Sequence, residues 1–110
     1  CFSVYPNLMI NRYGPWMDTN VVTPTGPNTC VVHFDYFVEA DFMPRVDDKF
    51  VEDSLAASGR VQAEDTWLCE KVQGGMESPG YGSGRYAPAM EAAMFHFHDR
   101  LWRDLTAAEE

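Results

Sequence analysis

The sequence predicts a single α+β domain in which an antiparallel sheet packs against a long helix, followed by a second C-terminal helix. Three observations carry this prediction: apolar strand-like segments up to Val38, a long apolar stripe between Asp47 and Gly74, and a second stripe after Pro88. The chain has 110 residues, of which 45% are hydrophobic. This length and composition suit one domain with a small core.

The first part of the chain is expected to form an antiparallel sheet of about three strands. Residues 2–12 are apolar around a proline and predict a strand with a local irregularity. A turn at Gly14 separates them from a second strand over 16–22, and the turn-rich residues 23–28 lead to a third strand over 29–38. A sheet of this size needs a helix across one face for stability.

Two helices are expected after the sheet, over residues 47–74 and 88–106. Acidic residues at Asp47 suit a first helical turn, Gly74 favours the end of that helix, and Pro88 suits the first position of the next. Apolar residues at helical spacing predict one buried stripe on each helix. The stripes are Val51, Leu55, Val61, Leu68, Cys69, Val72 and Met76 on the first helix, and Met90, Met94, Phe97, Leu101 and Leu105 on the second.

The composition disfavours several classes of partner. Seventeen acidic and eight basic residues give a net charge of −9, which disfavours binding to nucleic acid and to anionic membrane surfaces. No stretch has the roughly 20 apolar residues that span a bilayer. The three cysteines are scattered and form no Cys-x-x-Cys pair, which argues against a zinc site of cysteines and favours a reducing compartment.

One carboxylate lies near the centre of the first predicted stripe. Asp65 follows Val61 by four residues and precedes Leu68 by three, so all three share one side of a helix. Burying an unpaired carboxylate costs several kcal/mol, so a buried Asp65 needs a partner. Three alternatives remain open: a structural cation, a proton or a metal ion. The available cations are Arg12, Arg45 and Arg60.

The surrounding sequence favours the metal. In residues 60–75 the pair Glu64-Asp65 is followed by Glu70 and then by Gln73-Gly74-Gly75. This run resembles the C-terminal catalytic domain of Rieske-type non-haem iron oxygenases, which has a helix-grip fold. Residues 5–20 are similar to one branch of that family, the plant-type choline monooxygenases. The resemblance extends from about residue 2 to residue 103, and further similar runs are 34–37, 84–87 and 97–98.

This resemblance implies an iron site to which the chain contributes one ligand. The family binds mononuclear Fe(II) through two histidines and one carboxylate, and Asp65 matches the carboxylate. Glu64 is expected to support this ligand from beside it. Electrons arrive in the family from a Rieske [2Fe–2S] cluster. Neither the Rieske motif nor the iron-binding histidine pair is present, and the chain opens at Cys1, so we expect a C-terminal portion that is inactive alone.

The histidines that are present do not replace that pair. His96 and His98 are two residues apart on a predicted helix and therefore point in different directions, about 200° around the axis. They would serve together only if the segment were a strand. His33 is expected to be a hydrogen-bonded histidine within the sheet.

The activity implied by the resemblance is ferredoxin-dependent oxidation of choline to betaine aldehyde hydrate, the first step toward glycine betaine. The implied partners are a small quaternary ammonium substrate, O₂, reduced ferredoxin and further copies of the chain in a family-type trimer. The implied location is the chloroplast stroma in a plant or alga and the cytoplasm in a bacterium. Asn7, Asn11 and Val61 are expected to line the substrate pocket. Aromatic candidates for contact with the cation are Tyr5, Tyr13, Trp16, Tyr36 and Phe37.

Two alternatives remain open. A related Rieske oxygenase could act on glycine betaine, carnitine or another methylated amine, because such enzymes differ mainly in pocket residues. A protein of another class, a non-catalytic helix-grip module that binds a ligand without iron, would share the fold. A Rieske motif and a histidine pair upstream of this chain distinguish an oxygenase from such a module.

Overall fold

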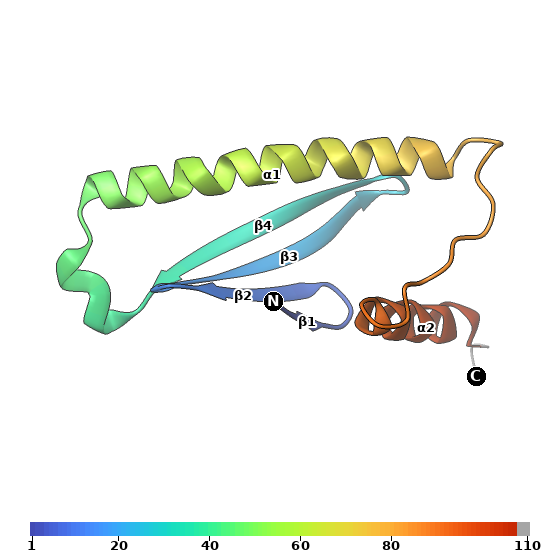
Figure 1. Cartoon of the computed structure of the whole chain (residues 1–110), viewed down its shortest axis with the longest axis horizontal. Helices are drawn as coiled ribbons and strands as arrows, with labels where there is room; N and C mark the ends of the chain where they lie inside the picture. Colours follow the sequence, from blue (N-terminus) through green and yellow to red (C-terminus); the bar gives the residue numbers. More distant parts are fainter. Residues whose placement is uncertain (108–110) are drawn as a thin grey trace. The chain divides into compact units, whose positions relative to one another are not determined.

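The computed structural model describes residues 1–107, which form two units, and each unit is considered by itself. The first unit comprises Cys1–Met43 together with the chain from Tyr86 onward, and the second comprises Pro44–Arg85. An antiparallel four-stranded sheet and helices make up these residues (Figure 1). The predicted α+β class is therefore confirmed. That the long helix packs across the sheet remains a prediction.

The sheet is a meander of four strands, one more than expected. Its strands β1 (Phe2–Val4), β2 (Leu8–Tyr13), β3 (Trp16–Gly26) and β4 (Thr29–Val38) lie in the order β1-β2-β3-β4, and each neighbouring pair is antiparallel (Figure 1). The run expected to be one strand folds back on itself as β1 and β2. Pro6 lies between them, and a proline has no N–H to donate to a ladder of strands.

The turn at Gly14 lies where it was expected, whereas the turn between β3 and β4 is tighter than expected. Gly14 has a φ of +53° between β2 and β3, a left-handed conformation that favours glycine. The residues predicted as a loop over 23–28 largely extend β3, since Thr23 pairs with Val31 and Pro24 with Cys30. Only residues 27–28 form the turn. A register shift next to Pro24 accommodates the proline within a strand.

The strand register places polar and aromatic residues on one face of the sheet. Asn11 of β2 pairs with Asp18 of β3, which pairs in turn with Tyr36 of β4. Because side chains alternate along a strand, Trp16 and Asn20 lie on the same face as Asp18. Among the described residues only Asp18 and Asn20 are buried, with 5% and 6% of their surfaces exposed. This surface is called the Asp18 face below.

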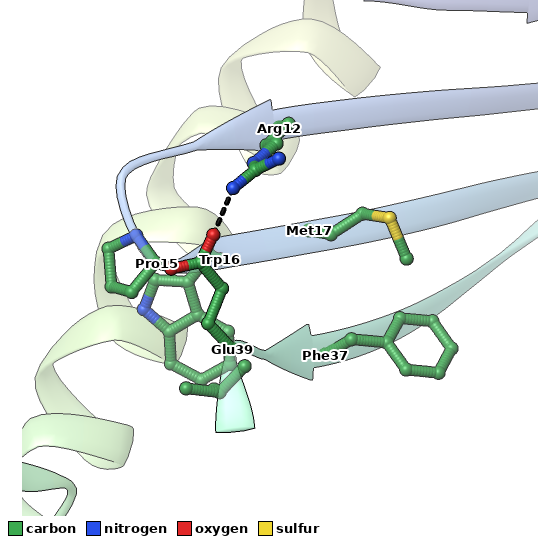
Figure 2. Close-up of a pocket in the computed structure, with 7 residues that line it drawn as sticks. Arg12, Pro15, Trp16, Met17, Phe37 and Glu39 are labelled. Carbon is green, nitrogen blue, oxygen red and sulfur yellow. Dashed lines mark hydrogen bonds and ion pairs between the residues drawn. The ribbon is translucent and has the colours of Figure 1, made fainter. Parts of the chain in front are cut away.

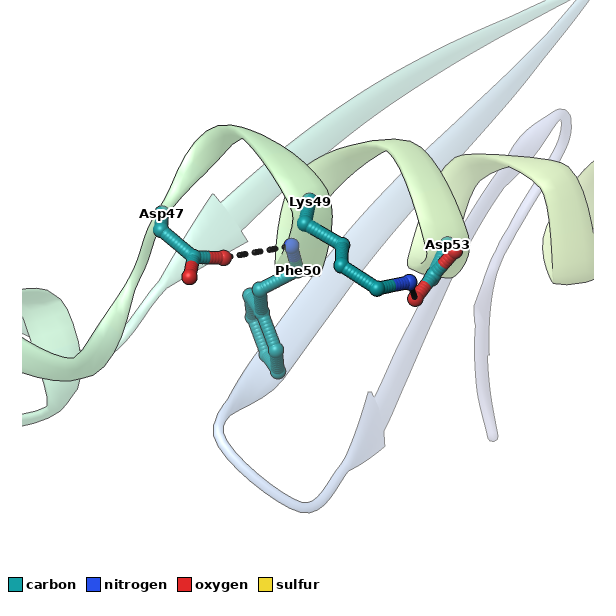
Figure 3. Close-up of polar contacts among 4 residues, drawn as sticks. All are labelled: Asp47, Lys49, Phe50 and Asp53. Carbon is teal, nitrogen blue, oxygen red and sulfur yellow. Dashed lines mark hydrogen bonds and ion pairs between the residues drawn. The ribbon is translucent and has the colours of Figure 1, made fainter.

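The long helix α1 spans Asp48–Met76 and follows a short 3₁₀ helix, Ala40–Arg45. The prediction of 47–74 is confirmed within two residues. Asp47 caps the first turn, and its carboxylate accepts a hydrogen bond from the backbone N–H of Phe50 at 2.7 Å (Figure 3). The helix continues through Gly74 and Gly75 to Met76. A glycine lowers helix stability only modestly, and the continuous backbone hydrogen bonds outweigh that cost.

We expect Asp47→Ala in the full-length protein to fray the start of α1. Loss of a side-chain N-cap costs about 1 kcal/mol, so amide exchange in the first turn should accelerate about fivefold. Hydrogen–deuterium exchange measured over that turn checks the result. The matched control is Asp53→Ala, which removes only an exposed ion pair with Lys49 at 2.5 Å (Figure 3) and about 0.3–0.5 kcal/mol. Equal exchange in the two variants would contradict the capping role.

The second helix, α2, spans Ala92–Thr106, so its predicted start at Pro88 is wrong. Pro88 lies in a turn in which the N–H groups of Met90 and Glu91 both donate to the carbonyl of Ala87. The Glu91 carboxylate also accepts from the backbone N–H of Ala87 at 2.6 Å. These bonds hold the segment as a turn, a conformation that the fixed φ of proline suits equally well.

Aromatic contacts place α2 against the turn between β1 and β2 within the first unit. The rings of Tyr5 and Phe97 lie 5.6 Å apart, and the Arg100 guanidinium lies 5.6 Å from the centre of the Tyr5 ring. The Tyr86 hydroxyl is hydrogen bonded to Nδ1 of His98 at 2.6 Å. The Tyr5 contacts therefore place α2 beside this turn, and the Tyr86 bond joins α2 to the segment that precedes it.

The predicted burial of the two helical stripes is wrong for the described residues. Val61 and Leu68 on α1 are 53% and 54% exposed, and Met90 and Leu105 near α2 are 88% and 74% exposed. No hydrophobic side chain in the part of the chain that the structure describes is buried. The helices expected from the spacing of the apolar residues are present. Each unit by itself, however, has too few packed layers to bury the apolar side of a helix.

No helix within residues 1–107 combines the length and the apolar composition needed to cross a membrane.

Candidate functional site

The predicted iron ligand lies in the middle of α1. Asp65 and its neighbour Glu64 are both exposed, and with three further residues of the helix they line an open hollow on the second unit. The other residues of this hollow are Ala63, Trp67 and Leu68. Val61 lies one turn earlier on α1 and is also exposed. Asp65 is therefore presented on a rigid element with its side chain accessible.

The expectation that Asp65 is buried is wrong, and so is an ion pair as its partner. Within the described residues Asp65 forms no hydrogen bond and no ion pair. Arg12, one of the cations considered for it, pairs with Glu39 instead. Because the carboxyl group is exposed, water can solvate it and no protein partner is required. Its oxygens are free to accept a ligand or water.

The chain by itself does not assemble a metal site. Among residues 1–107 no group of three histidine, cysteine or acidic side chains is arranged to hold a metal ion. The second unit, to which Asp65 belongs, contains no histidine in its sequence. A carboxylate oxygen suits Fe(II) as one ligand of a site with two histidines and one carboxylate. The chemistry of the Asp65 side chain thus suits one position of such a site, and its unit contains no histidine for the other two.

A polar cluster on the sheet surrounds Asp18 and Asn20, the two buried residues in the described part of the chain. Oδ1 of Asp18 accepts hydrogen bonds from Nδ2 of Asn11 at 2.9 Å and from Nδ2 of Asn20 at 2.6 Å. Asn11 also donates to the side-chain oxygen of Asn20 at 3.1 Å. The Tyr13 hydroxyl is a further hydrogen-bonding neighbour of Asp18. Asn11, Tyr13, Asp18 and Asn20 are called the Asp18 cluster below.

Neutral donors alone surround the charge of this cluster. Asp18 forms no ion pair within the described residues. Burial, followed by the hydrogen bond and the negative charge of Asp18, raises the pKa of Tyr13 to about 12. The phenol therefore stays protonated near neutral pH and remains a donor to the carboxylate. The cluster therefore surrounds the Asp18 carboxyl with hydrogen-bond donors and brings no cationic side chain to it.

Aromatic rings lie beside the cluster on the same face. Tyr36 is the β4 partner of Asp18, and Phe34 is the β4 partner of Asn20. The Trp16 and Tyr36 rings lie 6.3 Å apart and nearly perpendicular at 86°, whereas Phe34 and Tyr36 lie 6.3 Å apart with their planes 16° from parallel. The Asp18 face thus combines a buried carboxylate with three neighbouring aromatic side chains.

The asparagines expected in the substrate pocket have different surroundings. Asn11 belongs to the Asp18 cluster, whereas Nδ2 of Asn7 donates to the carbonyl of Val22 at 2.9 Å and ties the turn after β1 to β3. Both lie in the first unit, and Val61 lies in the second. Their role in a pocket remains a prediction.

Sequence reasoning missed Asp18 and Asn20. A signal for them was present, since Asp18 and Asn20 are two residues apart and therefore share one face of a strand with the apolar Trp16 and Val22. Finding the cluster also required the register that pairs Asp18 with Asn11.

A second hollow lies where β2 turns into β3 and β4 ends (Figure 2). Its volume is about 220 Å³, and the guanidinium of Arg12 and the carboxylate of Glu39 form an ion pair across its rim. The other residues around it are Pro15, Trp16, Met17, Phe37 and Val38. Its charges compensate each other and its walls are otherwise apolar. This hollow therefore offers a weaker basis for chemistry than the Asp18 face.

Comparison with known families identifies the chain's class. Residues 1–107 match the family described as the ring-hydroxylating alpha subunit, catalytic domain. The chain belongs to this family. The match covers all the residues that the structure describes, so the sheet and both helices are parts of a ring-hydroxylating catalytic domain. No solved structure matches the chain at a significant level.

Curated relatives of this ring-hydroxylating domain carry a single name. Over 102 residues, 93% of the chain, it is 55% identical to the chloroplastic choline monooxygenase of Arabidopsis thaliana. It is 45% identical over 102 residues to the protein of that name from Spinacia oleracea, and 45% identical over 95 residues to that from Atriplex hortensis. These matches cover 92% and 86% of the chain. The chain spans 24%, 23% and 21% of the three relatives' lengths.

Proposed function

We propose that this chain is the C-terminal part of the catalytic domain of a Rieske-type choline monooxygenase. The observation that carries the proposal is the 55% identity to a choline monooxygenase over 93% of the chain. In the proposed reaction choline, O₂, two electrons from reduced ferredoxin and two protons give betaine aldehyde hydrate and water. One oxygen atom enters the C–H bond of the alcohol carbon, and the other leaves as water.

Asp65 is the proposed carboxylate ligand of the mononuclear iron in the whole protein. The membership of the chain in the ring-hydroxylating family supports this role, as does the place of Asp65 in the middle of helix α1 with no ion pair among the described residues. When bound, the iron supplies the site at which O₂ is activated. Asp65 holds the metal by one carboxylate and balances part of its charge. Glu64, next to it, is proposed to steady its orientation.

The remaining parts of the enzyme are proposed to lie outside this chain. They are the two histidine ligands of the iron and the Rieske [2Fe–2S] cluster that receives electrons from ferredoxin. A trimer of whole subunits is proposed as the assembly. The curated relatives are named as chloroplastic, and this supports the chloroplast stroma as the location of the whole protein.

A substrate panel with the full-length protein tests the proposal. Purified protein, reduced ferredoxin and O₂ are mixed separately with choline, glycine betaine and carnitine, and the products are identified by mass spectrometry. We expect kcat/KM for choline to exceed the other values at least about tenfold. Preferred turnover of glycine betaine or carnitine would reassign the substrate within the family. A full-length protein with no iron and no turnover of any amine would indicate a ligand-binding module.

A further inference from the structure

We propose that Asp18, flanked by Trp16 and Tyr36, provides the negative charge and the ring faces that select a quaternary ammonium group. This assignment rests on the proposed function and adds to it the residues that recognise the substrate's cationic end. All of them lie within the first unit and on a single face of its sheet.

The first argument is the charge of the Asp18 cluster. A carboxylate that is 95% buried normally has a cation nearby, because desolvating its charge is costly. Among the described residues Asp18 accepts hydrogen bonds from the amides of Asn11 and Asn20, has the phenol of Tyr13 beside it, and forms no ion pair. Arg12, on the neighbouring strand β2, projects from the opposite face and pairs with Glu39. The cluster therefore gives the Asp18 side chain hydrogen bonds but no opposing charge.

The second argument is the kind of cation that this arrangement favours. Oδ1 of Asp18 already accepts two hydrogen bonds, and the Tyr13 hydroxyl is a further donor to the carboxylate. A primary ammonium group needs several acceptors for its N–H bonds, and most of the acceptor positions of this carboxylate are already in use. A quaternary ammonium group has no N–H and requires only a negative charge and aromatic faces. The occupied acceptors thus favour the quaternary group.

The third argument is the position of the aromatic rings. Tyr36 lies directly across from Asp18 on β4, and Trp16 precedes Asp18 by two residues on β3. The planes of the two rings lie 86° apart, an angle at which neighbouring walls of an aromatic enclosure can surround a rounded cation. The two rings and the carboxylate come from adjacent paired strands, and this pairing fixes their spacing before a ligand arrives.

Binding to two ligands of the same shape tests the proposal. The ligands are choline and its uncharged isostere 3,3-dimethylbutan-1-ol, titrated calorimetrically into oxidised full-length protein without ferredoxin, so that no turnover occurs. In the variant Asp18→Asn we expect Kd for choline to rise about 10- to 100-fold, as loss of a full charge about 6 Å away predicts. The Kd for the isostere should change less than about twofold, because the side chain keeps its shape and an acceptor oxygen.

The matched control is Asp35→Asn, which removes the same charge from β4 on the opposite face, where Asp35 is exposed. We expect its Kd for choline to stay within about twofold of wild type, since an exposed charge is screened by solvent. Equal weakening of choline in the two variants would show a general charge effect and overturn the assignment. Equal weakening of both ligands by Asp18→Asn would show a structural role and also overturn it.

A second variant decides the matter if Asp18→Asn does not fold. Tyr36→Leu removes a ring face and leaves the carboxylate, and we expect about a 3- to 30-fold loss of choline affinity with a smaller loss for the isostere. Unchanged preference for choline over the isostere would overturn the proposal. If the wild-type protein oxidises choline and these variants still prefer choline over the isostere as strongly as the wild type does, only the role of Asp18 and its neighbouring rings is overturned. A wild-type protein that neither binds nor oxidises choline overturns the proposed function as well.

Discussion

Asp65→Ala in the full-length protein is expected to remove the mononuclear iron and abolish choline oxidation, while the absorbance of the [2Fe–2S] cluster persists. The carboxylate is the single anionic protein ligand of the proposed site, and alanine offers no oxygen to replace it. Iron analysis should fall from about three to about two atoms per subunit, because the cluster keeps its own two. Product formation should fall to background.

The control for this prediction is Glu52→Ala, which removes another exposed carboxylate from the same helix. This variant should retain the full iron content and wild-type turnover. Glu52 lies more than three helical turns from Asp65, and a solvated charge at that distance contributes little to a metal site. Full iron content and turnover in Asp65→Ala would contradict the assignment of the ligand. The same loss of iron in both variants would point to the helix as a whole rather than to Asp65.

Asn20→Ala is expected to lower the stability of the full-length protein by about 2–3 kcal/mol. Asn20 is 6% exposed and donates a 2.6 Å hydrogen bond to the buried Asp18 carboxylate. Its removal leaves a buried charge with fewer donors, and this is among the costlier defects that a single substitution creates. The midpoint of thermal unfolding should fall by about 2–5 °C, a small shift because the whole protein is large.

Asn28→Ala is the matched control, because it deletes the same amide from an exposed turn residue between β3 and β4. We expect a change below about 0.5 kcal/mol, as for most exposed substitutions. Thermal unfolding followed by circular dichroism compares the two variants. Equal midpoints would mean that the Asp18 cluster does not hold β2 and β3 together, and the structural account of this face would be wrong.

Local signals predicted the helices better than the strands. Asp47 marked the start of α1 because an N-cap is encoded within a few residues, and its bond to Phe50 confirms it. The break after β1 was predicted as an irregularity within one strand. Pro6 predicts a disruption of an apolar run, but it does not predict that the chain reverses direction there. Pro88 suggested a helix start, but the carboxylate of Glu91 stabilises a turn at that position. Such competition depends on side-chain contacts that a sequence pattern does not contain.

The candidate site was only partly accessible from the sequence. Asp65 lies on the predicted helix, but its predicted burial is wrong. Helical periodicity indicates which side of a helix a residue occupies and does not indicate whether another element packs on that side. Asn11 was found as a polar residue on an apolar strand. Asp18 and Asn20 were missed because their partnership with Asn11 depends on the register of two strands. Register is a tertiary property that the turn at Gly14 sets.

The most direct test of the central claim is choline-dependent O₂ consumption by full-length protein loaded with iron and with its [2Fe–2S] cluster. The proposed function predicts that O₂ uptake requires both choline and reduced ferredoxin, and that each O₂ consumed yields one betaine aldehyde. Loaded protein that consumes no O₂ with choline, or consumes it without forming betaine aldehyde, would contradict that claim.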